Sequence, residues 1–497
     1  MGYVLGIDLG TTGIKAIIFD RESNILGIGL SELPLIFPEP GWVEQDPAIM
    51  WKSVVDSVSV ALSISKIKKE EILSVGIAHQ GESVMAWDSA DGKPFYNNIL
   101  WQDRRTSVRC DELKLQVGLS QEITKKTGLL IDPFFSSTKI EWLLQNVSDI
   151  SRRLKEKRVR VGTLDSWMIW MLSGGKSFLT DYTSASRTML FNLKGKYWDE
   201  DLLRLFSIPV EILAEPKPSS YFFGMTDPNN FLGIVAPITG AVVDTQGALF
   251  GQVCFEKGDI KNTYGTSCVI QLNIGEEPVL LKNGLTTTVA LSFGDTVDYA
   301  AEGIIYISGA AVQWLRDGLE IISNAAESEQ MAKSVEDTMG VYFIPAFVGL
   351  AAPYWDYRTR GTIVGLTRGV RKEHIVRATL ESIAYQVKDV VDLMERETGV
   401  SVRELKVDGG AVKNAFLMQF QADILGIPVI VPKVTETTCL GAAYISGLQV
   451  GFWKNLKEIK QNWKMEKIYT PSMERAKVDE LYGGWSRAVR GAISIYK

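Results

Sequence analysis

Residues 4–20 read Val4-Leu-Gly-Ile-Asp8-Leu-Gly10-Thr11-Thr12-Gly13-Ile-Lys15-Ala-Ile-Ile-Phe-Asp20: an apolar strand into an aspartate, a Gly-Thr-Thr-Gly turn and a second apolar strand. The two glycines make a positive φ or the close approach of a ligand inexpensive. Successive N–H groups in such a turn form a concavity that binds anions, and the two threonine hydroxyls add donors. Asp8, at the strand end, can hold a hydrated magnesium ion beside phosphates. The motif predicts phosphate binding, with a plain β-hairpin as the alternative.

A second strand–turn–strand pattern starts at Ile260 and passes through Gly265, Thr266 and Ser267. Its glycine lies about 255 residues after Gly10. The similarity of the two motifs indicates that one type of domain is duplicated, although a repeat seen at a single motif gives only modest support for a duplication.

Length and charge limit the classes of function. A chain of 497 residues exceeds the size at which one core stops growing, so we expect two domains. A net charge of −6 gives no electrostatic footprint for nucleic acid or for an anionic membrane. The start of the chain lacks a basic region followed by an apolar one, so we expect no signal peptide and a cytoplasmic location.

Cysteine and histidine usage narrows the chemistry further. The four cysteines have no CxxC spacing, which disfavours a zinc site and is consistent with a reducing compartment. Only His79 and His374 could serve a mechanism that needs a histidine base. His374 falls in an amphipathic helical pattern, which leaves His79 as the candidate.

Other signals place the remaining elements. Asp46-Pro47 predicts a helix start, and the helical stripe of Glu373–Thr398 ends at Gly399. A strand over Ile72–Ala78 delivers His79-Gln80-Gly81-Glu82 at its end. The domain boundary is expected near residues 245–256, which gives domains 1–250 and 251–497.

With these pieces in order, the chain resembles the FGGY carbohydrate kinases, most closely their glycerol kinase branch. Residues 134–146 (FFSSTKIEWLLQN) are similar to the first signature of the family. Residues 361–366 (GTIVGL) and 374–381 (HIVRATLE) are similar to the second. Residues 184–192, 313–317 and 416–426 also match, so the resemblance runs almost end to end.

The resemblance implies an α/β fold of two ribonuclease-H-like (actin-like ATPase) domains around a cleft that closes on ATP and substrate. The two glycine–threonine turns become two phosphate loops, one from each domain, and closure excludes water from the transferring group. The activity implied is ATP- and Mg²⁺-dependent phosphorylation of a hydroxyl of a small polyol or ketose.

Residue roles follow from the same resemblance. Asp244 is expected to be the general base, and Asp8 the carboxylate on the magnesium side. The acceptor is expected to contact Gln80, Gly81, Glu82, Trp101, Phe134, Asp244 and Thr245. The nucleotide is expected to contact Thr11, Thr12, Lys15, Gly265, Thr266, Gly309, Gln313, Gly410 and Asn414. The family often has arginine at the position of Lys15, which would give bidentate contact. For Gly309, helix packing is as good an explanation as nucleotide contact.

The acceptor residues depart from the glycerol kinase pattern. That branch has Arg-Glu where this chain has Gly81-Glu82, Tyr in place of Phe134, and Asp-Gln in place of Asp244-Thr245. Loss of the arginine opens volume, and loss of the tyrosine hydroxyl removes a hydrogen-bond partner. We therefore expect an acceptor larger than glycerol, such as a tetritol, a pentitol, xylulose or ribulose, with glycerol itself as the alternative.

Two other classes of protein are alternative interpretations of this sequence. One is a non-catalytic actin-like nucleotide sensor, which would have no need of the acceptor-side residues Glu82 and Asp244. The other is a chaperone-type ATPase, but no separate peptide-binding domain follows the second half. Since oligomers are common in the family, we expect a homodimer.

Overall fold

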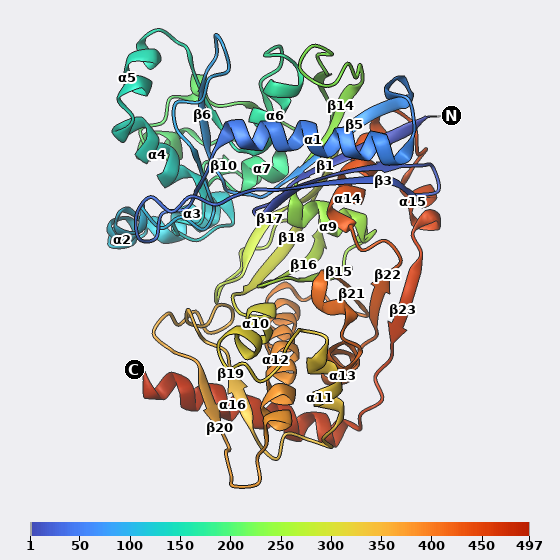
Figure 1. Cartoon of the computed structure of the whole chain (residues 1–497). Helices are drawn as coiled ribbons and strands as arrows, with labels where there is room; N and C mark the ends of the chain where they lie inside the picture. Colours follow the sequence, from blue (N-terminus) through green and yellow to red (C-terminus); the bar gives the residue numbers. More distant parts are fainter. Residues whose placement is uncertain (1, 497) are drawn as a thin grey trace.

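The computed structural model describes residues 2–496, which form two lobes joined by one 13-stranded sheet (Figure 1). In spatial order the strands are β23 (Met465–Tyr469), β22 (Val429–Pro432), β21 (Leu405–Asp408), β15 (Ile260–Tyr264), β16 (Cys268–Gly275), β18 (Thr296–Ile305), β17 (Thr286–Phe293), β13 (Ser220–Met225), β14 (Pro237–Val243), β5 (Ile72–His79), β1 (Tyr3–Leu9), β2 (Gly13–Phe19) and β3 (Ile25–Glu32). The two halves of the sheet meet between β13 and β17, where the one paired position is Ser220 with Phe293.

The same strand pattern occurs twice in this sheet. The first half runs β3-β2-β1-β5-β14, and the second runs β18-β16-β15-β21-β22. In each half the first three strands in chain order are antiparallel, and the last two are parallel to the first strand. The expected fold of two ribonuclease-H-like domains is therefore confirmed. The boundary at residues 250/251 stays a prediction.

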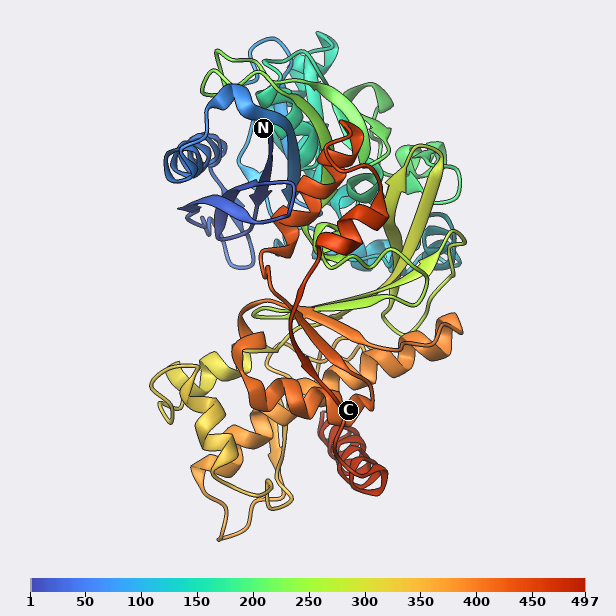
Figure 2. The same ribbon diagram turned by 90° about the vertical axis from the view of Figure 1, so that its right-hand side faces the viewer.

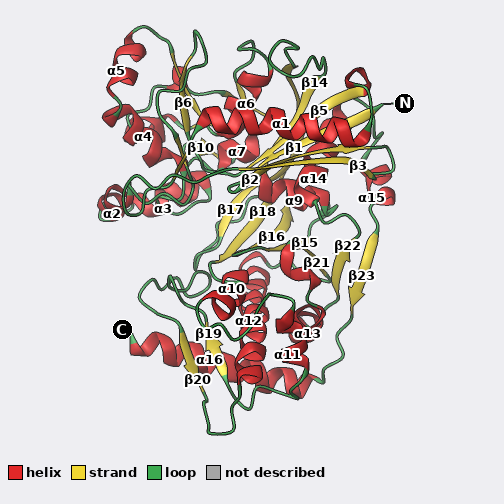
Figure 3. Ribbon diagram, viewed as in Figure 1, coloured by secondary structure: helices red, strands yellow, loops and turns green. Residues whose placement is uncertain are grey.

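Helices pack against the sheet and also lie in the segments attached to it, as Figure 3 shows. In the first half they are α1 (Pro47–Ser65), α2 (Ser107–Lys114), α3 (Leu119–Thr127), α4 (Ser136–Asn146), α5 (Ser148–Lys155), α6 (Leu164–Leu172), α7 (Tyr182–Ser186), α8 (Glu200–Leu205) and α9 (Asp244–Gly251). In the second half they are α10 (Gly309–Asp317), α11 (Glu327–Lys333), α12 (Lys372–Thr398), α13 (Ala415–Leu425), α14 (Thr437–Gln449), α15 (Leu456–Asn462) and α16 (Arg475–Ile495).

Short elements complete the chain. The strands outside the main sheet are β4 (Glu44–Gln45), β6 (Met85–Asp88), β7 (Asn98–Ile99), β8 (Val159–Gly162), β9 (Leu179–Asp181), β10 (Phe191–Asn192), β11 (Tyr197–Trp198), β12 (Glu215–Lys217), β19 (Tyr342–Ile344) and β20 (Thr362–Val364). Single turns of 3₁₀ helix occur at Lys69–Glu71, Val210–Ile212 and Gly410–Lys413.

Two of the predicted helices have the expected ends. Asp46 caps α1 by accepting from the amides of Ala48 and Ile49, and Gly399 ends α12 in the left-handed conformation with φ of 68°. By length and composition alone α1 could cross a membrane, which is weak evidence because core helices pass the same test. Its buried stripe contains Met50 and Val54, which belong to the same hydrophobic cluster as β1 and β2.

Helix α14 belongs to the second half of the sequence but packs against the first half of the sheet. It contacts β1, β5 and β14, and Figure 2 shows this part of the chain reaching up into the upper lobe. There α14 crosses α9, and glycines make the contact possible: a Cβ on Gly441 would lie 1.8 Å from the carbonyl oxygen of Gly247, and one on Gly251 would lie 2.0 Å from that of Thr437. The two backbones therefore touch directly.

We predict that Gly441→Ala destabilises the protein by about 2 kcal/mol or more, because the added methyl group cannot fit without separating α9 from α14. The matched control is Gly491→Ala in α16, where an added Cβ meets nothing within 4 Å and alanine stabilises a helix by up to about 1 kcal/mol. Thermal unfolding measures both variants. An unchanged melting temperature for Gly441→Ala would contradict the close crossing.

Candidate active site

The first glycine–threonine turn joins β1 to β2, and the amide of Gly10 donates to the carbonyl of Gly13 at 3.0 Å. Neither glycine has a positive φ, so of the two expected reasons for these glycines only the close approach of a ligand stays a prediction. What the turn restricts is space, since a Cβ on Gly13 would lie 3.0 Å from the carbonyl oxygen of Ser31. A small residue is needed here because another part of the chain lies close.

The hydroxyl groups of the turn have different surroundings. Thr11 Oγ1 donates to Gln80 Oε1 at 3.1 Å and accepts from Trp101 Nε1 at 3.0 Å, whereas Thr12 is exposed. Thr11 therefore connects the turn to two of the residues expected to bind the acceptor. Gln80 is held in turn by Gln45, to which its Nε2 donates at 2.9 Å.

Asp8 lies at the end of β1 with its carboxylate buried. Burial raises the pKa of Asp8 to about 6, although the nearby Lys15 partly opposes the rise. Within the described residues 2–496, Asp8 Oδ1 has no hydrogen-bond partner. A buried carboxylate oxygen with a free lone pair fits the expected role in binding a hydrated magnesium ion. Lys15 is engaged elsewhere, with Nζ 2.6 Å from Glu436 Oε2 of the second half.

The second glycine–threonine turn joins β15 to β16 and supports the start of α10. The amide of Gly309 donates to the carbonyl of Gly265, and the amide of Ser308 donates to that of Thr266, both at 3.0 Å. A Cβ on Gly309 would lie 2.6 Å from the Gly265 oxygen, so close packing is sufficient to explain this glycine. Gln313 is exposed on the same helix, one turn further along.

Gly410 and Asn414 lie beside this second turn. Strand β21 pairs with β15 so that Asp408 is opposite Thr263, and the chain then turns at Gly409 with φ of 91°. A Cβ on Gly410 would meet nothing within 4 Å, which leaves open space at that position. The side chain of Asn414 caps α13 by accepting from the amide of Leu417 at 3.0 Å.

Asp244 is the first residue of α9, at the end of β14. The ends of β1, β5 and β14 lie side by side, since Asp8 is opposite Ala78 and Val243 is opposite His79. The pKa of Asp244 is raised to about 6, mainly by burial and also by the carboxylate of Asp8, while His79 opposes the rise. Helix α9 also packs against β15 and β16, so the start of the helix lies between the two halves of the sheet.

The expected acceptor residues lie near Asp244, with Gln80, Gly81 and Glu82 buried and Trp101, Phe134 and Thr245 half-buried. The rings of Trp101 and Phe134 meet edge to face with centroids 5.6 Å apart. Glu82 has a left-handed backbone with φ of 58°. Burial raises the pKa of Glu82 to about 7, with Arg187 opposing the rise. A Cβ on Gly81 would lie 3.0 Å from Val243 Cγ1, so that side chain is close to the glycine. The open volume expected in place of the arginine stays a prediction.

Sequence reasoning missed the role of Arg187, although this residue lies within a matched stretch. Arg187 Nε donates to Glu82 Oε1 at 2.5 Å, and its Nη2 lies 2.7 Å from Glu302 Oε1 on β18. The side chain is buried, and the two acids come from different halves of the sheet. Because they lie more than 100 positions away in opposite directions, no local pattern could have identified them.

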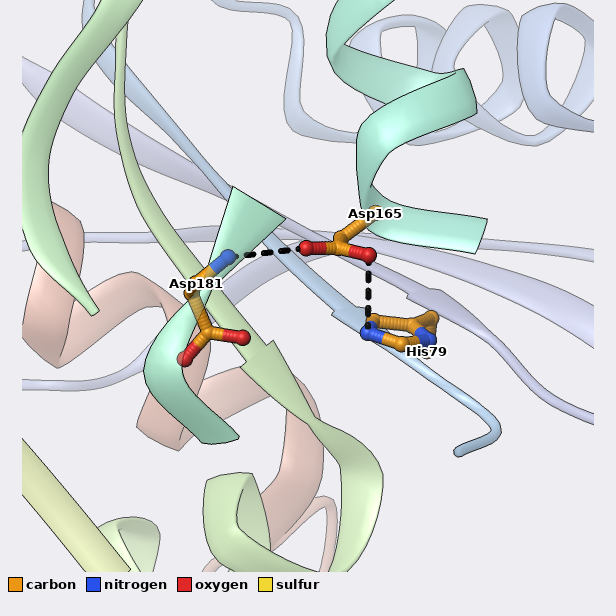
Figure 4. A group of neighbouring side chains, drawn as sticks. All are labelled: His79, Asp165 and Asp181. Atoms are coloured by element: carbon orange, nitrogen blue, oxygen red, sulfur yellow. Dashed lines mark hydrogen bonds and ion pairs between the residues drawn. The ribbon is translucent and has the colours of Figure 1, made fainter. Parts of the chain in front are cut away.

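His79 lies in a buried group with Asp165 and Asp181, shown in Figure 4, whose ligand atoms lie within 4.8 Å of one another. Hydrogen bonds already occupy these atoms. His79 Nε2 is 2.8 Å from Ser184 Oγ and Nδ1 is 2.8 Å from the Gln80 carbonyl, while each acid accepts from hydroxyl and amide groups. The group therefore supports the strand end that carries Gln80, and it offers neither a free metal ligand nor a free base.

Comparison with known proteins identifies the family to which a chain with these features is similar. Residues 3–251 match the N-terminal domain of the FGGY family of carbohydrate kinases, and residues 260–450 match its C-terminal domain. Glycerol kinase from Petrotoga mobilis is 51% identical over 490 residues, which cover 99% of this chain and 98% of the relative.

Solved structures agree with the sequence relatives. The crystal structure of Plasmodium falciparum glycerol kinase with ADP has a TM-score of 0.94 at 34% identity, over 99% of this chain and 98% of the other. Ligand-bound xylulose kinase from Lactobacillus acidophilus, at 23% identity, TM-score 0.89 and coverage of 100% and 99%, shares the fold. The relatives with high identity are glycerol kinases, so the expectation of a larger acceptor is not confirmed.

We predict that Asp244→Asn stabilises the protein. A carboxyl group whose pKa is raised from 3.8 to about 6 stays protonated in the folded state while it ionises in the unfolded chain. Its contribution to stability is therefore largest below pH 3.8 and is lost as the pH rises through about 6. Asparagine cannot ionise, so urea unfolding should give the variant about 1–3 kcal/mol of extra stability at pH 8, with no gain near pH 4.

The control for this measurement is Asp227→Asn, because hydrogen bonds from Asn229 and Lys176 lower the pKa of Asp227. That substitution should not stabilise the protein at pH 8. If Asp244→Asn were equally destabilising at both pH values, the carboxylate would not be held charged at a cost in stability.

Proposed function

We propose that this chain, which belongs to the FGGY family of carbohydrate kinases, transfers the terminal phosphoryl group of ATP to a hydroxyl of glycerol. As a member of the glycerol kinase type, it is an ATP-dependent phosphotransferase with an alcohol group as acceptor, and it uses ATP with Mg²⁺. The observation that carries the acceptor proposal is 51% identity to a glycerol kinase over 99% of this chain.

In this proposal Asp244 accepts the proton of the attacking hydroxyl. Three features support the role: the residue is half-buried at the start of α9, it lies between the two halves of the sheet, and a pKa of about 6 keeps it ionised at neutral pH. Phosphoryl transfer depends mainly on positioning and charge stabilisation, so one well-placed carboxylate is enough as a base.

The phosphates of the nucleotide are assigned to the two glycine–threonine turns. Thr11 and Thr12, with Lys15, would bind them from the first half, and Gly265 and Thr266 from the second. When bound, Mg²⁺ would supply charge neutralisation for the phosphates, and Asp8, whose buried Oδ1 has no hydrogen-bond partner within residues 2–496, would hold it. Gly309, Gln313, Gly410 and Asn414 remain the proposed surroundings of the nucleoside; the open space at Gly410 supports this.

Glu82, Trp101 and Phe134 are the proposed walls of the acceptor site, with Gln80, Gly81 and Thr245 beside them. A second candidate function, an acceptor of four or five carbons, is favoured by one observation. Gly81 and Phe134 offer no polar side-chain group to a three-carbon acceptor, so a longer molecule with more hydroxyls would gain contacts elsewhere. A homodimer and a cytoplasmic location are also proposals.

We predict that Asp244→Ala and Asp244→Asn lower kcat by about 10³-fold, since the proton acceptor is removed, while leaving ATP binding unchanged, since the proposed nucleotide contacts are made by other residues. Steady-state kinetics and nucleotide titration measure the two effects. Asp111→Asn on exposed α2 is the control and should have normal kcat. A kcat for Asp244→Asn within a few-fold of the parent would remove Asp244 as the base.

An acceptor panel separates the two candidate functions. We expect glycerol to give the highest kcat/KM among glycerol, erythritol, pentitols, ribulose and xylulose, each measured by ADP release with saturating ATP and Mg²⁺. If a four- or five-carbon acceptor exceeds glycerol by about 10-fold or more, the second candidate replaces the first; a 10-fold ratio corresponds to about 1.4 kcal/mol in transition-state binding. Absence of acceptor-dependent ADP release would contradict both.

A further inference from the structure

The Arg187 side chain lies where the two halves of the sheet meet the acceptor residues. It follows α7 and is 2% exposed. Its Nε donates to Glu82 Oε1 and its Nη2 faces Glu302, so two of its three nitrogens are used by the protein. Every nitrogen of a buried arginine normally donates a hydrogen bond, because an unpaired donor in the interior reduces the stability of the fold.

In the part of the chain that the structure describes, three buried polar atoms at and around Arg187 have no hydrogen bond. Among residues 2–496, Arg187 Nη1, Gln271 Oε1 and Glu302 Oε1 are buried and have no hydrogen-bond partner. Glu302 Oε1 lies 2.7 Å from Arg187 Nη2 but lacks the alignment of a hydrogen bond. Gln271 and Glu302 occupy opposite positions on β16 and β18, so the three side chains share one region of the sheet.

This region is continuous with the acceptor residues. The guanidinium carbon of Arg187 lies 5.8 Å from the centre of the Phe134 ring, and Glu82 binds the same guanidinium. On the other side, Gln271 Nε2 donates to Glu302 Oε2 at 3.0 Å and to Thr245 Oγ1 at 3.2 Å. Thr245 follows Asp244 directly. The unpaired atoms therefore lie between the proposed acceptor walls and the proposed base.

We propose that Arg187 is an acceptor-binding residue whose Nη1 donates to a non-reacting hydroxyl of the bound polyol, while Gln271 Oε1 and Glu302 Oε1 accept from hydroxyls of the same molecule. One donor and two acceptors match a polyol, because each of its hydroxyls both donates and accepts. The assignment rests on the proposed function and names the groups in this chain that recognise the acceptor.

The composition of the site supports this assignment. Gly81 has no side chain, and Phe134 has no hydroxyl group. Lys139, another buried cation nearby, donates to the carbonyls of Pro133 and Phe134 at 3.1 and 2.6 Å and so serves the backbone. Arg187 is the cation with a free donor beside Glu82, and its other two nitrogens fix the direction of that donor.

The test combines a variant with altered acceptors. Arg187→Lys keeps the positive charge but replaces the planar guanidinium group, with its several N–H donors, by an ammonium group. We expect KM for the acceptor to rise about 10- to 100-fold, as for a lost hydrogen bond to a charged group. KM for ATP should stay within about twofold. The control is Arg109→Lys. The guanidinium of Arg109 on α2 donates two hydrogen bonds to Glu141 on α4, so this substitution should leave both KM values unchanged.

Acceptor analogues separate direct contact from a structural role. When glycerol is the acceptor, 1,2-propanediol and 1,3-propanediol each lack one hydroxyl. In the parent protein, loss of the hydroxyl bound by Arg187 should lower kcat/KM by about 10-fold or more; in Arg187→Lys the same loss should cost about threefold or less. Equal losses in the two proteins would overturn the proposal, and so would a change confined to KM for ATP.

If Arg187→Lys does not fold, a crystal structure of the parent protein with its best acceptor decides. A hydroxyl within hydrogen-bond distance of Arg187 Nη1 supports the proposal, and an acceptor bound without contact to Nη1 overturns it. If the parent protein phosphorylates the acceptor in either case, the proposed function stands, so the failure of one proposal is distinguishable from that of the other.

Discussion

The arrangement of the site depends on the close crossing of α9 and α14. Gly441 of α14 and Gly251 of α9 bring two helix backbones into contact, and a Cβ at either position would lie 2.0 Å or less from a carbonyl oxygen of the other helix. Asp244 begins α9, while Glu436, which pairs with Lys15 of the first turn, immediately precedes α14. The crossing therefore sets the position of the proposed base and ties the second half of the chain to the strand that follows the first glycine–threonine turn.

Around this crossing the protein keeps several acids in places that disfavour charge. Burial raises the pKa of Asp8, Glu82 and Asp244 alike, and the same burial leaves oxygen atoms of Asp8 and Glu302 without hydrogen bonds. Such groups reduce the stability of the free protein, and perturbed acids of this kind gather at functional sites. In the proposed function, magnesium, nucleotide and polyol hydroxyls are the partners of these groups, which would connect the cost in stability to the chemistry of a kinase.

Much of the fold could be predicted from local patterns. The Asp46 cap, the Gly399 stop and the two glycine–threonine turns depend on neighbouring residues, and the duplicated pattern follows from the resemblance between the turns. Other features could not be read in this way. The limited space at Gly13 comes from the carbonyl of Ser31 on β3, Val243 lies close to Gly81, and the ion pairs of Arg187 join residues more than 100 positions apart. A single sequence does not contain these distances, and the identity of the acceptor depends on them.

The central claim is that one nucleotide is bound by a turn from each half of the sheet. Hydrogen exchange with mass spectrometric detection tests it directly, with and without Mg²⁺ and a non-hydrolysable ATP analogue. Peptides that contain the Gly10–Gly13 turn and the Gly265–Ser267 turn should both gain protection when the analogue binds. Protection of one turn with no change at the other would contradict the claim.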